Sequence, residues 1–184
     1  MDNQELQAAP SYWISVLIGA LVAAIIVFVT GLIGSYSTLG SEPSGSLFNM
    51  FQLVGILSCL LSSVGGVIAV RHYAKEYEIT FKIGKGALIG LFTAIGIVAF
   101  SFILNYIWGQ FIDPSMEEAI IDWNIKNIDL MQIPDANKEA AYDQIENAFS
   151  AQAIALQTGI SLVTLSIVNV ISGIIAAKIF ASEE

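Results

Sequence analysis

Charged residues are scarce in this sequence: Asp, Glu, Lys and Arg make up 12% of its 184 residues, against about 25% in soluble domains. Only seven residues are Lys or Arg, and they form no basic cluster with interleaved aromatic side chains. Nucleic acid, which is bound through such clusters, is therefore excluded as a partner. What remains outside the hydrophobic runs is also too short for a separate catalytic domain.

Cysteine and histidine each occur once. Cys59 has no second cysteine with which to form an intrachain disulfide, and inside an apolar run it is interpreted as a small buried residue. His72 lacks the partners that a haem, a metal site or a nucleophilic dyad needs, so we interpret it as an interfacial anchor. The chain has no G-x-S-x-G, H-E-x-x-H or P-loop motif. We therefore expect no enzymatic activity and no cofactor.

Long hydrophobic runs are what the sequence has in abundance. Hydrophobic residues make up 55% of the chain, and its mean hydropathy is +0.72. A helix of about 20 apolar residues crosses a bilayer, and runs of that length cover residues 12–36, 46–70, 84–109 and 153–180. The sequence predicts an all-α polytopic membrane protein, with residues 1–184 as a single domain of four transmembrane helices. The polar N-terminus lacks the cationic region of a secretory signal, so the first run is expected to be retained.

The cationic residues are unevenly placed, and their distribution predicts the orientation of the chain. Four of the seven lie within residues 71–85, where the second run ends and the third begins, namely Arg71, Lys75, Lys82 and Lys85. Cytoplasmic loops carry such an excess of Lys and Arg. We therefore interpret these four residues as cytoplasmic anchors, and four crossings then leave both termini in the cytoplasm.

Small residues recur within the apolar runs at positions that favour close helix packing. Gly86, Gly90 and Ala94 are spaced by four residues, which is typical of membrane helices that approach one another closely. The candidate helix-packing residues are Gly86, Gly90, Ala94, Gly65, Gly66 and Gly173. The spacing leaves open whether the partner helix belongs to this chain or to another. Polar residues of the second and fourth runs likewise fit either helix packing or the lining of a channel.

An acidic segment separates the third and fourth runs. Residues 110–152 contain nine acidic side chains and two lysines. Asp113 with Pro114, or Ser115 with Glu118, is suited to begin a helix, and the sequence QIPD at 132–135 breaks it. No Gly or Pro follows until Gly159, so the second helix is expected to continue into the fourth run. The prediction is an external helical hairpin over residues 113–152, made by extensions of the third and fourth helices that project roughly 25 Å.

The third and fourth runs carry a resemblance to a known family. The segment EITFKIGKGALIG, the aromatic exit YIWGQFIDPSMEE, the acidic helical loop and a last run ending near a lysine resemble the four-span bacterial inner-membrane proteins of the domain of unknown function numbered 4199, seen mostly in Bacteroidota. The features are diffuse, notably Thr80-Phe81 and Asp113-Pro114. The resemblance implies the fold and a bacterial inner membrane, and it supplies no activity or functional residue.

The remaining function classes concern interaction and passage through the membrane. No run has an ionisable residue at its centre, which disfavours a coupled pump. Clustered carboxylates suit calcium, but their spacing matches no EF-hand, so we interpret them as a solvated face and expect no metal. The function that we predict is a small structural or accessory subunit of a larger membrane complex, with a membrane-protein partner or self-association. The alternative is a homo-oligomeric channel or facilitator for a small solute.

Overall fold

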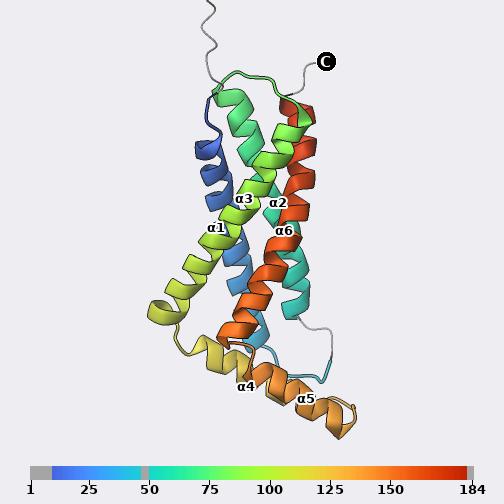
Figure 1. Ribbon diagram of the computed structural model, residues 1–184. Coiled ribbons are helices and arrows are strands. Elements are labelled where there is room, and N and C mark those ends of the chain that lie inside the picture. The colour runs from blue at the N-terminus through green and yellow to red at the C-terminus, as the bar shows by residue number, and fades with distance from the viewer. Residues whose placement is uncertain (1–9, 47–49, 182–184) are drawn as a thin grey trace, which may run out of the picture.

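The computed structural model describes residues 10–46 and 50–181, and within these residues all regular structure is helical (Figure 1). The elements in chain order are α1 (Trp13–Leu39), α2 (Met50–Glu76), α3 (Ile83–Ile107), the π-helix η1 (Trp108–Ile112), α4 (Met116–Asp129), α5 (Asp135–Glu146) and α6 (Ala151–Phe180). The beginning of the second predicted run, at 47–49, lies outside the described residues, as do residues 1–9 and 182–184.

The four predicted membrane-crossing helices are confirmed. They are α1, α2, the continuous stretch formed by α3 and η1, and α6, with 27, 27, 30 and 30 residues. At 1.5 Å per residue each exceeds a hydrocarbon core of about 30 Å. Large apolar side chains such as Leu60 and Val163 are exposed on their outer surfaces. In water this would be costly, whereas in lipid it is the expected arrangement, so the chain is a multi-pass membrane protein in a lipid bilayer.

The four long helices form an antiparallel bundle (Figure 1). α1 packs against α2 and α3, and α6 packs against the same two helices from the other side. α2 and α3 also contact each other, whereas α1 and α6 lie on opposite sides of the bundle. Because the chain crosses four times, Pro10 and Ala181 lie at one end of the bundle together with residues 77–82, while α4 and α5 lie at the other end.

The buried residues of α2 and α6 are concentrated toward one end of the bundle. The buried residues of α2 begin at Ser62 and those of α6 begin at Asn169. Between Ala151 and Val168, by contrast, every residue of α6 is at least partly exposed. Most of the core therefore lies toward the end that holds residues 77–82, and α6 is the helix that loses burial toward α4 and α5. α1 and α2 remain close there, since a Cβ atom added at Gly34 would lie 2.6 Å from Val54.

The predicted continuity of the acidic hairpin with the third and fourth helices is wrong. Residues 113–115 separate η1 from α4, and residues 147–150 separate α5 from α6. The second break has a clear cause: Ser150 is extended, and its Oγ accepts a hydrogen bond from the Ala153 amide at 3.2 Å. Such a cap satisfies an amide that has no partner inside the helix, so it begins a new helix instead of continuing the old one.

These breaks let α4 and α5 lie across the end of the bundle instead of extending its axis (Figure 1). The two helices pack against each other, and Asp129 holds them together. It accepts a bond from the Tyr142 hydroxyl at 2.5 Å through its carboxylate and one from Lys138 at 3.0 Å through its backbone oxygen. The predicted projection of roughly 25 Å is therefore also wrong.

Candidate functional site

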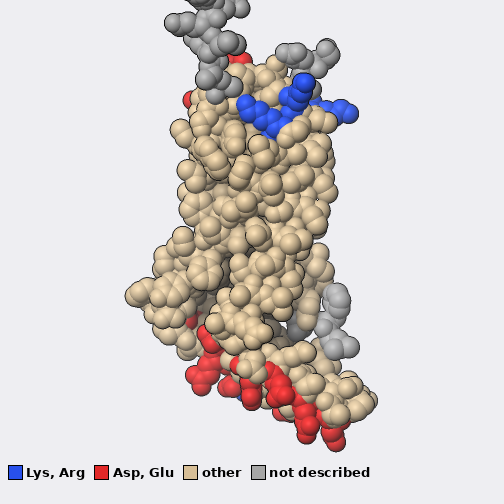
Figure 2. All heavy atoms as spheres, in the orientation of Figure 1, with Lys and Arg blue, Asp and Glu red and all other residues tan. Residues whose placement is uncertain are grey.

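The two ends of the molecule differ in charge: Figure 2 shows Lys and Arg side chains gathered at one end and most of the visible Asp and Glu side chains at the other. The end that holds residues 77–82, here called the cationic end, carries Arg71, Lys75, Lys82, Lys85 and Lys178. The opposite end, here called the acidic end, carries α4 and α5, and Figure 2 shows Asp and Glu side chains along their outer edge. The structure thus brings the four candidate anchors together at one end of the bundle, although their charges have different surroundings.

Lys85 differs from the other anchors because it bonds inside the bundle. Its Nζ donates to the Tyr73 hydroxyl at 2.7 Å and lies 4.7 Å from the centre of the Tyr73 ring. Tyr73 is fully buried, and its hydroxyl donates in turn to the Pro10 backbone oxygen at 2.7 Å. The buried hydroxyl thus both donates and accepts a hydrogen bond, and the half-buried ammonium gains one acceptor and a ring contact inside the bundle. The chain of bonds ties α3 and α2 to the segment that precedes α1.

Arg71, Lys75 and Lys82 are exposed, as residues that contact headgroups and water should be. His72, expected to act only as an interfacial anchor, also joins two helices: its Nδ1 lies 2.9 Å from Oγ of the buried Ser15 on α1. No sequence motif links these two residues, which are 57 positions apart.

The small residues of α3 pack against α6. A Cβ atom added at Gly86 would lie 2.5 Å from both the Ala177 Cβ and the Gly173 backbone oxygen. One added at Gly90 would overlap the Asn169 backbone oxygen and lie 2.8 Å from its carbonyl carbon. A Cβ atom added at Gly173 would lie 2.3 Å from the Gly86 backbone oxygen. The stripe on α3 therefore has its partner within this chain, which answers the question that the spacing left open.

The small residues of α2 face two different helices. A Cβ added at Gly65 would lie 2.9 Å from the Ala23 Cβ of α1, and one added at Gly66 would lie 2.5 Å from Ser172 Oγ of α6. Ala94, the last residue of the stripe on α3, is fully buried. All six candidate packing residues thus lie inside the bundle, where backbones approach closely.

Asn169 is the polar centre of this contact. Its side chain is fully buried, and Oδ1 accepts a bond from the Gly66 amide of α2 at 2.9 Å. Nδ2 donates to the Leu165 oxygen one turn earlier at 3.0 Å. Its hydrogen bonds are thus made to helices of this bundle, so Asn169 joins helices and does not line a channel within one chain. The sequence left the polar residues of the fourth run open between helix packing and the lining of a channel, and it did not single out Asn169.

At the acidic end, α4 binds the loop between α1 and α2. Asn127 is buried, and its Oδ1 accepts from the amides of Ser44 at 3.1 Å and Gly45 at 2.9 Å. Its Nδ2 donates to the Ser46 oxygen at 3.1 Å. Trp123 Nε1 adds a bond to the Ser41 oxygen at 2.8 Å. One side chain thereby satisfies three backbone groups of a loop whose described residues, 40–46, form no helix or strand.

Gly45 is required where this loop meets α4. Its φ of 69° is in the left-handed region, and an added Cβ would lie 2.6 Å from the Leu130 backbone oxygen. Both the backbone conformation and the close contact favour glycine. No pattern in the sequence indicates that α4 binds this loop.

Asp113 connects the entrance of α4 to the end of α1. The Tyr36 hydroxyl donates to its Oδ2 at 2.6 Å, and Ser115 Oγ donates to its Oδ1 at 2.8 Å. These two bonds hold the pKa of Asp113 below its usual range, and the bond from Tyr36 has the larger effect. The stabilisation is therefore present above the ordinary carboxyl pKa and is lost as the pH falls through the lowered value. The pairing of Ser115 with Glu118 predicted that the Ser115 side chain would cap α4. Instead, Ser115 precedes α4 without a side-chain cap, and its hydroxyl bonds Asp113.

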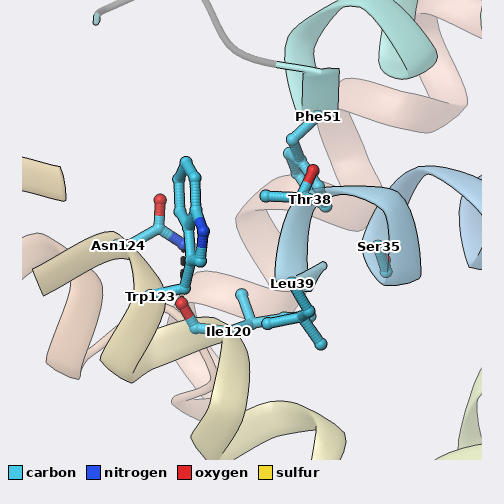
Figure 3. Close-up of a pocket in the computed structure, with 7 residues that line it drawn as sticks. All are labelled: Ser35, Thr38, Leu39, Phe51, Ile120, Trp123 and Asn124. Atoms are coloured by element: carbon cyan, nitrogen blue, oxygen red, sulfur yellow. Dashed lines mark hydrogen bonds between the residues drawn. The ribbon is translucent and has the colours of Figure 1, made fainter. Parts of the chain in front are cut away.

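A small cavity lies between α1, α2 and α4 (Figure 3). Its volume is about 10 Å³, and Figure 3 shows Ile120, Trp123 and Asn124 of α4 on one side and residues of α1 and α2 on the other. That volume suits a single water molecule and excludes an organic substrate. Within residues 10–46 and 50–181, no group of three or more His, Cys, Asp or Glu side chains is arranged to hold a metal ion.

The bundle, its lipid-facing apolar surface and its two charged ends define a polytopic four-helix membrane protein. A family model described as "Protein of unknown function (DUF4199)" matches residues 8–182. The chain therefore belongs to this family, as the sequence features around the third and fourth helices indicated. No curated protein and no solved structure matches the chain.

The contact between α3 and α6 predicts that substituting alanine for glycine has different effects on stability at two positions of α3. Gly90→Ala should destabilise the protein by about 1–3 kcal/mol, because the added methyl group forces the two backbones apart. Gly84→Ala is the matched control on the same helix, since nothing lies within 4 Å of its added Cβ, and it should be neutral or stabilising by up to about 1 kcal/mol. Unfolding in mixed micelles measures both; equal effects would contradict the packing described here.

The contact between α4 and the α1–α2 loop generates a second prediction. Asn127→Ala leaves three backbone groups without their partner, so we expect a loss of about 1–3 kcal/mol and faster hydrogen exchange at Ser44 and Gly45. Asn124→Ala is the control, because the Asn124 amide donates only to Ile120 of its own helix. If exchange at the loop is unchanged in Asn127→Ala, α4 does not hold the loop in solution.

Proposed function

We propose that this protein is a small structural or accessory subunit of the bacterial inner membrane that packs against a larger membrane complex and has no chemistry of its own. The observation that carries the proposal is the uncovered first half of α6. Between Ala151 and Val168 no residue is buried, and the half-exposed Leu165 is the residue of this segment that packs against a core cluster of the bundle.

Lipid satisfies the apolar side chains of this segment but not its polar ones. Gln157, Ser161 and Thr164 are exposed on one side of α6, and none of the three makes a side-chain hydrogen bond within the described part of the chain. Polar side chains in a membrane helix gain more from a partner helix than from lipid tails. These three residues, here called the polar face of α6, are the contact that we assign to the partner.

The acidic end supplies a second contact outside the bilayer. Carboxylates of α4 and α5 such as Glu118, Asp122 and Glu139 are exposed, and Figure 2 shows Asp and Glu side chains along the outer edge of these helices. We assign this end to the periplasm, and the cationic end with both termini to the cytoplasm, because cytoplasmic segments are enriched in Lys and Arg. A partner with a basic surface beside the membrane would complement both the position and the charge.

Co-purification tests the proposal. Gently solubilised protein at its native expression level should run with a larger assembly whose components mass spectrometry identifies. The triple variant Gln157→Leu, Ser161→Ala, Thr164→Val should be released from it, because the polar contacts to the partner are lost. Ile160→Leu with Ile167→Leu is the control on the same exposed side of α6 and should remain bound.

Recovery of the wild type alone as a monomer would contradict the accessory role. Recovery as a defined homo-oligomer would instead support the alternative, a channel or facilitator formed by several copies. Because Asn169, Ser172 and Ser62 are buried, such a channel would have to be lined by other residues, and solute flux in liposomes would test it.

The orientation is tested by labelling intact cells with an impermeant thiol reagent. In a Cys59→Ser background, cysteines at Glu42 and Glu118 should react from outside, whereas one at Lys82 should react only after permeabilisation. All three positions are exposed, so local burial does not explain a difference. Labelling at Lys82 alone in intact cells would invert the proposed orientation.

A further inference from the structure

The outward side of α2 changes from apolar to cationic near its end. Leu57, Leu60, Val64 and Ile68 recur at intervals of three or four residues, so they share one side of the helix. Leu60 is 62% exposed. Beyond Ile68 the same side continues with Arg71 and Lys75. An apolar surface that leads directly to cations at the bilayer edge has the polarity pattern of a phospholipid, with chains below and an anionic headgroup above.

A hollow marks the point of change. Its volume is about 320 Å³, and among the described residues it is lined by Ile68, Arg71, His72, Lys75 and Glu76. This is far larger than the cavity at the acidic end, and it opens to the surface of the bundle. His72 is fixed by the contact of its Nδ1 with Ser15, so α1 and α2 together hold this wall in place.

The two cations of the hollow have no anionic partner in the described part of the chain. Arg71 lies 6.0 Å from the centre of the Phe180 ring, and neither Arg71 nor Lys75 forms an ion pair there, even though Glu76 lines the same hollow. They are four residues apart on one helix, where like charges repel each other. An anion bound between them would remove that repulsion.

Two general effects also favour cations at this end, namely the enrichment of Lys and Arg in cytoplasmic segments and the dipole at the end of α2. The first applies equally to Lys82 and Lys178, which lie at the same end but do not line the hollow. A specific site therefore predicts a difference between the two pairs of cations, whereas the general charge effect predicts none.

We propose that this hollow binds the phosphate of an anionic membrane phospholipid. The planar guanidinium of Arg71 is suited to two parallel hydrogen bonds with phosphate oxygens, and Lys75 supplies a second charge. The acyl chains lie along Ile68, Val64 and Leu60. Free phosphate shares the headgroup chemistry but lacks the chains, and the apolar surface below the cations is the reason to assign a lipid. The site does not depend on the proposed accessory role.

Native mass spectrometry of the purified full-length protein tests the site, with phosphatidylglycerol as the anionic probe and phosphatidylcholine of the same chains as the zwitterionic one. The wild type should retain one phosphatidylglycerol in preference to phosphatidylcholine. Arg71→Gln with Lys75→Gln should lower retention by on the order of tenfold, because two headgroup charges are lost. Lys82→Gln with Lys178→Gln removes the same charge from the same end and should change retention less than about twofold.

Three results would overturn the proposal. If both double variants lose phosphatidylglycerol to the same extent, overall charge at this end explains the binding and no specific site is needed. If the wild type retains the two lipids equally, the headgroup charge is not recognised. Displacement of phosphatidylglycerol by inorganic phosphate at equal concentration would assign the hollow to free phosphate. Melting curves of the two variants serve as the folding control, because the substituted side chains are exposed.

Discussion

The contact of backbone against backbone between α3 and α6 is the constraint on which the rest of the bundle depends. Gly86 and Gly90 of α3 meet Gly173 and Asn169 of α6 with no room for a side chain between them. At this distance dispersion forces act between the main chains themselves, and one buried amide, that of Asn169, extends the contact to Gly66 of α2. Without a hydrophobic effect between helices in lipid, such contacts are the main source of cohesion.

The cationic and acidic ends are held together by different interactions. At the cationic end, Tyr73 and Lys85 fill and close the bundle, so the cohesion of the helices continues to the membrane surface. At the acidic end the first half of α6 has no buried residue, and the contact of α4 with the α1–α2 loop adds order to the α1–α2 pair. This contact uses directed hydrogen bonds from Asn127 and Trp123 instead of burial of a large apolar area. A surface left open by such an arrangement is available to another molecule.

The sequence predicts the number and position of the spanning helices because membrane thickness imposes a length that a simple count of apolar residues detects. It predicts close packing around Gly90 but not the partner helix, since small residues spaced by four suit any facing backbone. The role of Asn127 cannot be predicted from a sequence motif, because its hydrogen-bond partners are backbone atoms 81 to 83 residues away and every residue type offers such atoms. The break before α6 depends on Ser150, a capping residue in a segment that lacks both Gly and Pro, where continuity was expected.

The bond between Asn127 and the α1–α2 loop also bears on the order in which the chain assembles. Ser44 and Asn127 are 83 residues apart, so the first two helices are made and inserted well before α4 emerges to hold their turn. During that interval the turn is free and the α1–α2 pair is incomplete at the acidic end. The last helix then brings Asn169 to Gly66, so the earliest helical pair gains its final contacts at both ends only after synthesis is nearly finished. Maturation is therefore a late event, and a truncated chain that ends before α4 lacks the means to complete it.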